Sequence, residues 1–168
     1  MKAFRIKELN HFMSRLLKSD AFDCFLLSEG TVVTYNTFVI DGHMVKEFFA
    51  GDVADGGEMP LYDFSCWADM RPLCFDLIKG KRTPVSFKFV LHLKPELVAE
   101  ILKKEESSVS PSDIKALVLN IKYDGSELTC ITATAFHSFL PVKAPDRLWD
   151  QFIQSFLDAK GISFEELS

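Results

Sequence analysis

Closely spaced cysteines and long apolar runs are both missing from this sequence. Its four cysteines, Cys24, Cys66, Cys74 and Cys130, are scattered among apolar neighbours, and no two have the C-x-x-C spacing typical of zinc and redox sites. We therefore expect four buried thiols, no metal site and no cofactor. No window approaches the ~20 apolar residues of a membrane helix, so we expect no membrane partner.

The sequence also has fewer positively than negatively charged residues. The chain has 19 Lys and Arg residues against 24 Asp and Glu residues, which gives a net charge of −5. This balance disfavours attraction of the whole surface to nucleic acid or anionic lipid. Residues 1–8 interleave charged with apolar side chains, unlike the apolar stretch of a signal peptide. We accordingly expect a cytoplasmic protein.

No catalytic motif stands out in the sequence. The serines lack the glycine context of a nucleophile elbow. The four histidines have no further His, Cys or carboxylate at metal-ligand spacing, and the turn dipeptide Asp41-Gly42 accounts for the neighbouring His43. These observations favour a non-enzymatic protein.

Phenylalanine dominates the aromatic residues, with 16 Phe against three Tyr and two Trp. Because Phe carries no polar group, most of these rings are expected in a buried core. The composition of the 168 residues is 48% hydrophobic and 26% charged, which is typical of one folded domain with a single core.

Apolar periodicity and turn residues predict alternating strands and helices. A strand at 3–6 precedes an amphipathic helix at 9–18. The further predicted elements are strands at 23–27 and 31–40 joined by a turn at 28–30, a strand at 44–49, a loop at 50–62, a helix at 64–79 broken or kinked at Pro72, a strand at 85–93, a helix at 95–104, a polar linker at 105–113, a hairpin of 114–123 with 127–139 around Asp124-Gly125, and a helix at 145–160.

This order of elements predicts an α+β fold. Two βαββ-type units would form a mostly antiparallel curved sheet with helices packed on it. We assign residues 1–168 to a single domain. Within it we expect a pseudo-repeat of residues 1–49 and 84–139, an inserted loop and helix at 50–83, and a C-terminal helix at 145–160.

A helix followed by a hairpin occurs in both halves, as residues 12–17 with 25–40 and as residues 97–104 with 117–136. In this order the chain resembles one domain of a DNA sliding clamp. The resemblance implies helices that line a ring and pass over the DNA backbone without reading sequence. Glutamates dilute the cations of the second helix, and phosphate binding needs local positive charge, so nucleic acid is kept only as an alternative partner.

Short stretches over nearly the whole chain carry a second resemblance. They are residues 1–6 (MKAFRI), 25–29 (FLLSE), 36–38 (NTF), 40–43 (IDGH), 71–75 (RPLCF) and 78–84 (IKGKRTP). In these stretches the chain resembles a small family of uncharacterised bacterial proteins. That resemblance implies no activity.

Two groups of residues are candidates for a binding site. Lys79, Lys81 and Arg82 lie at a predicted junction between a helix and a strand, with Arg71 upstream. They could bind an anion or an acidic partner, or offset the dipole at the end of the helix. The pair Phe48-Phe49 beside the glycine-rich loop could anchor a partner or lie in the core.

Three functions remain open on this basis. The first is a non-enzymatic interaction domain that self-associates or binds an unidentified protein, because the edges of an open sheet have to be covered or paired. The alternatives are a binder of a small anionic ligand at residues 79–82 and an enzyme whose site the sequence order hides.

Overall fold

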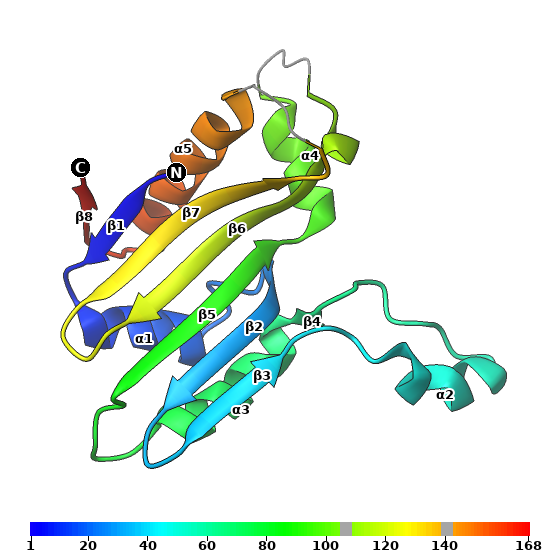
Figure 1. Cartoon of the computed structure of the whole chain (residues 1–168), viewed down its shortest axis with the longest axis horizontal. Helices are drawn as coiled ribbons and strands as arrows, with labels where there is room; N and C mark the ends of the chain where they lie inside the picture. Colours follow the sequence, from blue (N-terminus) through cyan, green and yellow to red (C-terminus); the bar gives the residue numbers. More distant parts are fainter. Residues whose placement is uncertain (105–108, 139–142) are drawn as a thin grey trace.

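One antiparallel sheet of eight strands organises the computed structural model, which describes residues 1–104, 109–138 and 143–168 (Figure 1). The strands lie in the order β3-β2-β5-β6-β7-β1-β8, and β4 pairs with β2 beside this path. Their bounds are β1 Ala3–Ile6, β2 Phe25–Val33, β3 Thr37–Asp41, β4 Ser65–Cys66, β5 Ser86–Leu93, β6 Ile114–Tyr123, β7 Leu128–Phe136 and β8 Phe164–Leu167.

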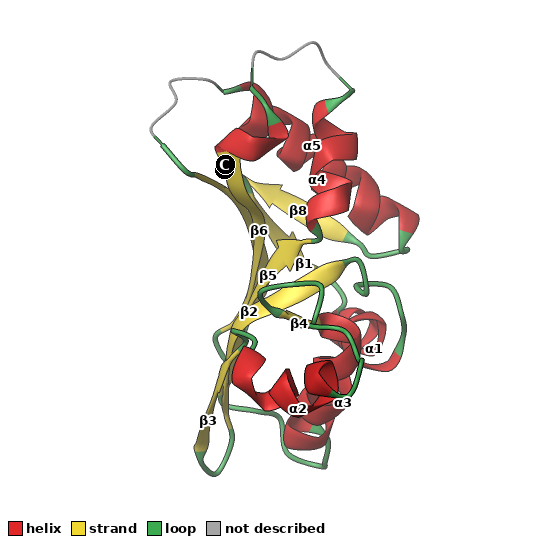
Figure 2. Cartoon of the chain, turned by 90° about the vertical axis from the view of Figure 1, so that its right-hand side faces the viewer, coloured by secondary structure: helices red, strands yellow, loops and turns green. Residues whose placement is uncertain are grey.

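Helices cover one face of this sheet. Figure 2 shows α1, α3, α4 and α5 on the same side, and among the described residues no helix lies over the other side. The protein is therefore α+β, as predicted. The helices are α1 Leu9–Lys18, α2 Ala50–Ala54, α3 Trp67–Ile78, α4 Pro95–Leu102 and α5 Ala144–Ala159, with two short 3-10 helices, η1 Lys46–Phe49 and η2 Pro111–Asp113.

The core fills the space between the sheet and the helices, and aromatic rings form its centre. Phe22 packs against Phe12 of α1, Phe25 of β2 and Phe156 of α5, with ring centroids 5.5, 6.1 and 5.1 Å away. This cluster therefore joins both ends of the helical layer to the sheet. The buried phenylalanines are Phe4, Phe12, Phe22, Phe25, Phe87, Phe89 and Phe156.

The amphipathic helix predicted at 9–18 is confirmed as α1. Its apolar stripe buries Phe12, Leu16 and Leu17. The indole N–H of Trp67 in α3 donates a hydrogen bond of 3.0 Å to the carbonyl oxygen of Leu16, so α1 and α3 are held together. None of the helices in the described ranges has the length and apolar character that crossing a bilayer requires.

The turn predicted at residues 28–30 is wrong, because β2 runs unbroken from Phe25 to Val33. Gly30 lies within the strand, and a Cβ at this position would approach the Phe89 ring to 3.1 Å. The glycine therefore makes room for a neighbouring strand and forms no turn. The chain reverses after Val33 instead, where the Thr34 N–H donates to the carbonyl oxygen of Asn36.

The strand predicted at 44–49 is also wrong. The chain leaves the sheet after Asp41, and the 3-10 helix η1 and the short helix α2 follow. The predicted loop at 50–62 therefore begins with a helix. The reason is that the backbone beyond Gly42 pairs with the returning chain and not with β3, as the isolated bridge between His43 and Phe64 shows.

The helix predicted at 64–79 begins a few residues later in the sequence, at Trp67, and is not broken at Pro72. Residues Ser65–Cys66 pair with β2 as β4, and α3 then runs continuously through Pro72. Proline within a helix removes one backbone hydrogen bond, which α3 accommodates without starting a second helix. The short strand β8 was not predicted, since its sequence FEEL offers little apolar alternation.

The hairpin at Asp124-Gly125 is confirmed between β6 and β7. Gly125 has a φ of 98°, and the Asp124 carboxylate accepts the backbone N–H groups of Ser126 and Glu127 at 2.9 and 2.8 Å. The predicted end of the second strand at residue 139 lies outside the described residues. So does the stretch 105–108 of the predicted linker.

The element order β-α-β-β occurs twice, as β1-α1-β2-β3 and β5-α4-β6-β7. The pairing differs between the two. β5 lies between β2 and β6, whereas β1 lies between β7 and β8. The duplication of residues 1–49 and 84–139 therefore stays a prediction, as does the assignment of the whole chain to one domain.

Candidate functional site

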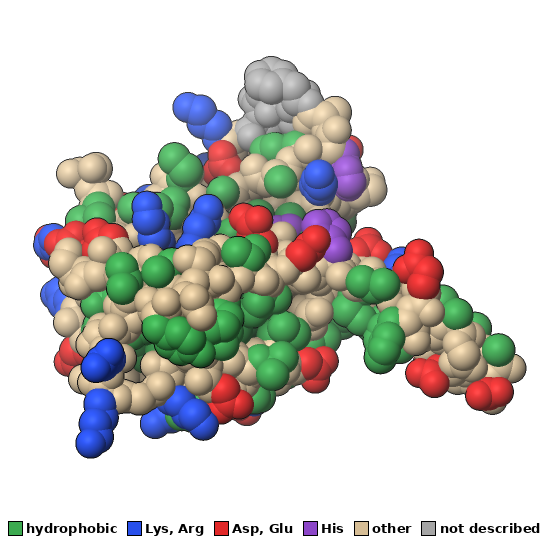
Figure 3. Space-filling view, turned by 60° about the horizontal axis from the view of Figure 1, so that its bottom comes forward, with side chains coloured by type: hydrophobic (Ala, Val, Ile, Leu, Met, Phe, Trp, Pro, Cys, Tyr) green, Lys and Arg blue, Asp and Glu red, His purple; other side chains and the backbone are tan. Residues whose placement is uncertain are grey.

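Residues 44–63, which we call the arm, project from the body of the protein (Figures 1 and 3). The arm contains η1 and α2, and none of its residues is buried. It leaves and rejoins the sheet at one place, because Met44 donates its N–H to the carbonyl oxygen of Asp63 at 2.8 Å. The arm is thus an excursion between β3 and β4.

A tight backbone contact fixes the base of the arm. Gly42 lies against the β-bulge of β2 between Leu27 and Glu29. Its N–H donates to the carbonyl oxygen of Ser28 at 2.8 Å, and its own carbonyl oxygen accepts the N–H of Ser65 at 2.9 Å. A Cβ at Gly42 would lie 1.8 Å from the carbonyl oxygen of Leu27. Only glycine fits this approach of two backbones.

A cluster of three rings, inclined to one another, continues the base of the arm toward the sheet. The ring centroid of Phe64 lies 4.6 Å from that of His43 and 4.9 Å from that of His92 on β5. His43 is held in turn by Asp41, whose carboxylate accepts the ring Nδ1 at 2.6 Å and the His43 backbone N–H at 3.0 Å. These hydrogen bonds lower the pKa of Asp41.

The burial of His92 in this ring cluster makes the stability of the protein depend on pH. Burial lowers the pKa of His92 below its ordinary value of 6.5, and the neighbouring charges of Lys115 and His43 lower it further. Below about pH 6.5 the unfolded chain then binds more protons than the folded chain, so we expect the free energy of unfolding to fall as the pH decreases. Urea unfolding between about pH 5 and 7.5 measures this slope.

The variant His92→Gln should flatten this dependence, since it removes the titrating ring. The matched control is His137→Gln, at an exposed position outside the ring cluster, which should keep the wild-type slope. An equal slope in wild type and His92→Gln would show that His92 does not couple protonation to folding.

Side-chain contacts hold the returning limb of the arm. The Lys46 ammonium lies 3.1 Å from the Asp63 carboxylate. The Tyr62 hydroxyl donates a hydrogen bond to Glu96 at the start of α4, which raises the pKa of Tyr62 to about 12. The Lys94 ammonium lies 5.6 Å from the centroid of the Tyr62 ring. The base is therefore tied to both β5 and α4.

Beyond its base the arm exposes apolar and acidic side chains together. Phe48 and Leu61 are 82% and 84% exposed. The other large apolar side chains exposed on the arm are Val45, Val53 and Met59. The arm also carries the carboxylates of Glu47, Asp52, Asp55, Glu58 and Asp63 against the single cation Lys46.

The sequence-predicted pair Phe48-Phe49 lies on η1, within the arm. The two rings meet edge to face with centroids 5.3 Å apart. Phe49 is half-buried and Phe48 is exposed, so neither belongs to the core. An exposed ring held on a helical turn can serve as an anchor for a partner.

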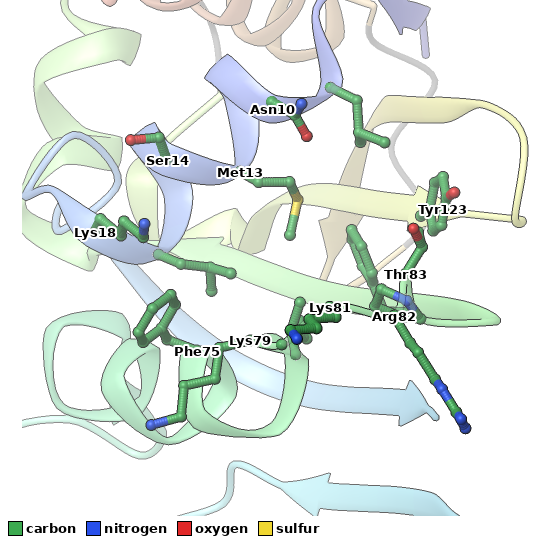
Figure 4. A pocket seen from close by; sticks show the side chains of 16 residues that line it. Asn10, Met13, Ser14, Lys18, Phe75, Lys79, Lys81, Arg82, Thr83 and Tyr123 are labelled. Atoms are coloured by element: carbon green, nitrogen blue, oxygen red, sulfur yellow. The ribbon is translucent and has the colours of Figure 1, made fainter. Parts of the chain in front are cut away.

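The basic residues predicted at 79–82 line a groove of about 350 Å³ between α1, α3 and the ends of β5 and β6 (Figure 4). Its apolar wall comes mainly from Met13, Leu17, Phe75 and Phe87. Tyr123 closes one end, and its hydroxyl donates to the carbonyl oxygen of Gly125 at 3.0 Å. We refer to this feature as the basic groove.

The cations of the basic groove are spread along its rim. Lys79 lies 3.1 Å from Asp76, and Lys18 lies 5.2 Å from the centroid of the Phe75 ring. No hydrogen bond or ion pair joins Lys81 or Arg82 to another residue in the described part of the chain. Figure 4 shows the side chains of Lys79 and Arg82 extending in different directions, so the cations do not converge on one point.

Arg71, the fourth predicted cation, is not among the residues that line the basic groove. Its guanidinium donates two hydrogen bonds to the carboxylate of Asp23, at 3.0 and 3.1 Å. This pairing raises the pKa of Arg71. The geometry assigns Arg71 the role of joining α3 to the segment before β2, and it leaves Lys79, Lys81 and Arg82 as the cations near one another.

The thiols are free but poorly suited to nucleophilic chemistry. Burial raises the pKa of Cys24 to about 11 and that of Cys74 to about 12, and it also raises the pKa of Cys66 and of Cys130. A thiol in this range is protonated at neutral pH. Across residues 1–104, 109–138 and 143–168 no three His, Cys, Asp or Glu residues are placed to hold a metal ion.

Sequence reasoning missed two parts of these surfaces. The helix α1 contributes Leu9, Met13 and Leu17 to the wall of the basic groove. Their spacing predicted an apolar helix face, but it did not predict the surface that this face borders. The ring cluster at the base of the arm joins positions 43, 64 and 92, and no local sequence pattern connects these positions.

Comparisons with known proteins add a family but no activity. The chain matches the Family of unknown function (DUF5721) over residues 15–165. No curated protein and no solved structure matches it.

Proposed function

This chain belongs to the Family of unknown function (DUF5721), and from that premise we propose that it is a protein-interaction domain whose docking element is the arm. The observation that carries the proposal is the exposure of Phe48 and Leu61, at 82% and 84%, on a projecting segment none of whose residues is buried. Large apolar side chains gathered outside the core are typical of interaction sites.

The arm is also suited to presenting these side chains in a fixed position. Gly42, the bridge between His43 and Phe64, and the hydrogen bond from Tyr62 to Glu96 hold its base. A fixed element loses less conformational entropy on binding than a free loop does. The fixed base therefore supports an arm that binds a partner, and not one that only connects β3 to β4.

We propose that the protein acts in the bacterial cytoplasm. Its four cysteines are free thiols, which is typical of a reducing compartment. A second candidate function is the binding of a small anion in the basic groove, favoured by Lys81 and Arg82 on its rim. Their spread along the rim fits a single small anion less well than an extended partner.

Photo-crosslinking in living cells tests the docking role of the arm. With p-benzoylphenylalanine in place of Phe48, we expect a discrete crosslinked adduct, because the position would lie in an interface. The matched control carries the same residue in place of Val39, which is 73% exposed but lies within β3.

The adduct is read as a shifted band on a denaturing gel and identified by mass. An adduct at position 48 that is at least about tenfold more abundant than at position 39 supports the arm as a docking element. Equal or absent adducts at the two positions would overturn the proposal.

A further inference from the structure

We propose that the arm of one copy of this chain docks into the basic groove of a second copy, so that copies associate head to tail. This inference rests on the proposed function, since it names the partner of the docking element. It assigns the basic groove a role that is distinct from small-anion binding.

Charge complementarity is the first observation that supports this pairing. The tip of the arm carries the carboxylates of Asp52, Asp55 and Glu58, and nothing in the described part of the chain pairs with them. The rim of the basic groove carries the unpaired cations of Lys81 and Arg82. Opposite charges on two surfaces raise the rate of encounter and fix the register of docking.

The apolar parts of the two surfaces are the second observation. The arm offers Phe48 and Leu61, while the groove wall offers Met13, Leu17 and Phe75. The groove volume of about 350 Å³ falls within the range of ~300–1,000 Å³ in which proteins bury small ligands. An aromatic anchor in such a pocket, surrounded by a charged rim, is the usual arrangement of an interface hot spot.

The shape of the rim favours an extended partner over a compact one. The side chains of Lys79 and Arg82 extend apart (Figure 4), and a second hollow, lined by Tyr35, Leu77 and Val85, lies on the other side of the same basic segment. The cations therefore form a ridge between two hollows. A helical arm with acids spaced along it matches this ridge, whereas a single phosphate would need converging donors.

The positions of the two surfaces exclude docking within one chain. The arm lies at one end of the long axis of the molecule, and the segment 79–85 lies at the other end (Figure 1). The base of the arm is fixed to the sheet, so the arm of a given copy can reach only the groove of another. Such a heterologous contact builds a closed ring or an open chain, depending on the rotation between copies.

Light scattering of the purified chain after size-exclusion chromatography tests this docking. For the wild type we expect a mass that rises with concentration above the 19.0 kDa of the monomer and that falls with added salt. The arm variant carries Asp52→Asn, Asp55→Asn and Glu58→Gln, so that its arm is neutral and is not attracted to the altered groove. The groove variant carries Lys81→Glu and Arg82→Glu. Each variant alone should remain monomeric.

The decisive measurement mixes the two variants. The arm variant keeps an intact groove and the groove variant keeps an intact arm, so an equimolar mixture should form a heterodimer of twice 19.0 kDa that grows no further. A mixture that stays monomeric, or that assembles beyond the dimer, would overturn the inference.

A matched control isolates the groove from net charge. Lys88 and Lys122 are exposed and face each other across β5 and β6 on the helix-free side of the sheet. The variant Lys88→Glu with Lys122→Glu changes the charge as much as the groove variant does, and it should assemble like the wild type. Loss of assembly in this control would place the contact on the sheet face instead.

Failure of this inference can be told apart from failure of the proposed function. A wild type that stays at 19.0 kDa at every concentration, together with a crosslink from position 48 to a different protein, overturns self-docking and leaves the arm as the docking element. Thermal stabilisation of that monomer by inorganic phosphate, lost in the groove variant, would assign the groove to an anion and also overturn self-docking.

Discussion

Replacing Gly42 with alanine (Gly42→Ala) is expected to lower the free energy of unfolding by at least about 3 kcal/mol. The added Cβ would lie 1.8 Å from the carbonyl oxygen of Leu27 and 2.8 Å from that of Ser28. Both contacts are with backbone, so no side-chain rotation can relieve them. The β-bulge of β2 or the base of the arm has to move, and urea unfolding measures the cost.

The matched control for this substitution is Gly51→Ala in α2. Apart from its chain neighbours and the backbone of its own helix, no atom of the described residues lies within 4 Å of a Cβ built at Gly51, and alanine is favoured over glycine in a helix by roughly 0.5–1 kcal/mol. Gly51→Ala should therefore leave stability unchanged or slightly higher. If Gly42→Ala unfolded at the same urea concentration as Gly51→Ala, the backbone approach at the base of the arm would not be a constraint on the fold.

The substitution Phe22→Ala is expected to cost about 3–5 kcal/mol, the usual range for emptying a buried aromatic site. Phe22 has no exposed surface, and its ring contacts those of Phe12, Phe25 and Phe156. The cavity would lie where α1, β2 and α5 meet. Edge-to-face ring contacts add to the loss of buried area.

Unfolding of Phe22→Ala can be followed by tryptophan fluorescence, because Trp67 and Trp149 are both fully buried. The control is Phe48→Ala, which removes the same side chain from an exposed site and should change stability by no more than about 0.5 kcal/mol. A cost below about 1 kcal/mol for Phe22→Ala would mean that the core can close over the missing ring. The two variants thus separate the Phe residues of the core from those of the arm.

Local patterns in the sequence were enough to predict the elements whose cause is local. The helix α1 follows from the spacing of Phe12, Leu16 and Leu17. The hairpin of β6 and β7 follows from Asp124-Gly125, because both the positive φ and the side-chain hydrogen bonds arise within the turn itself.

The failures have a common physical origin in contacts between distant residues. The sequence predicts turns at Gly30 and Gly42. In the structure Gly42 is instead required by the close approach of its backbone to that of Leu27, and Gly30 lies within a strand close to the Phe89 ring. Arg71 read as a surface cation and is instead paired with Asp23. Nothing in the neighbourhood of these residues in the sequence specifies such partners.

The candidate surfaces were predicted in part. The cluster of Lys79, Lys81 and Arg82 lies between the end of α3 and the start of β5, which is the junction of helix and strand that the sequence predicts. The sequence around Phe48 does not show whether its ring is exposed or buried, because an apolar side chain beside another apolar side chain is common in both settings. It follows from the chain leaving the sheet at Gly42.

The pairing of β1 with β7 and β8 has a consequence for how the chain folds. The first strand finds its partners only at the far end of the sequence, as in the ion pair between Arg5 and Glu127, which are 122 positions apart. Contacts of such long sequence separation slow folding. During synthesis β1 is made before the other strands of this sheet and is among the last of them to be paired. Until then the edge of β7 that β1 covers is open to other chains.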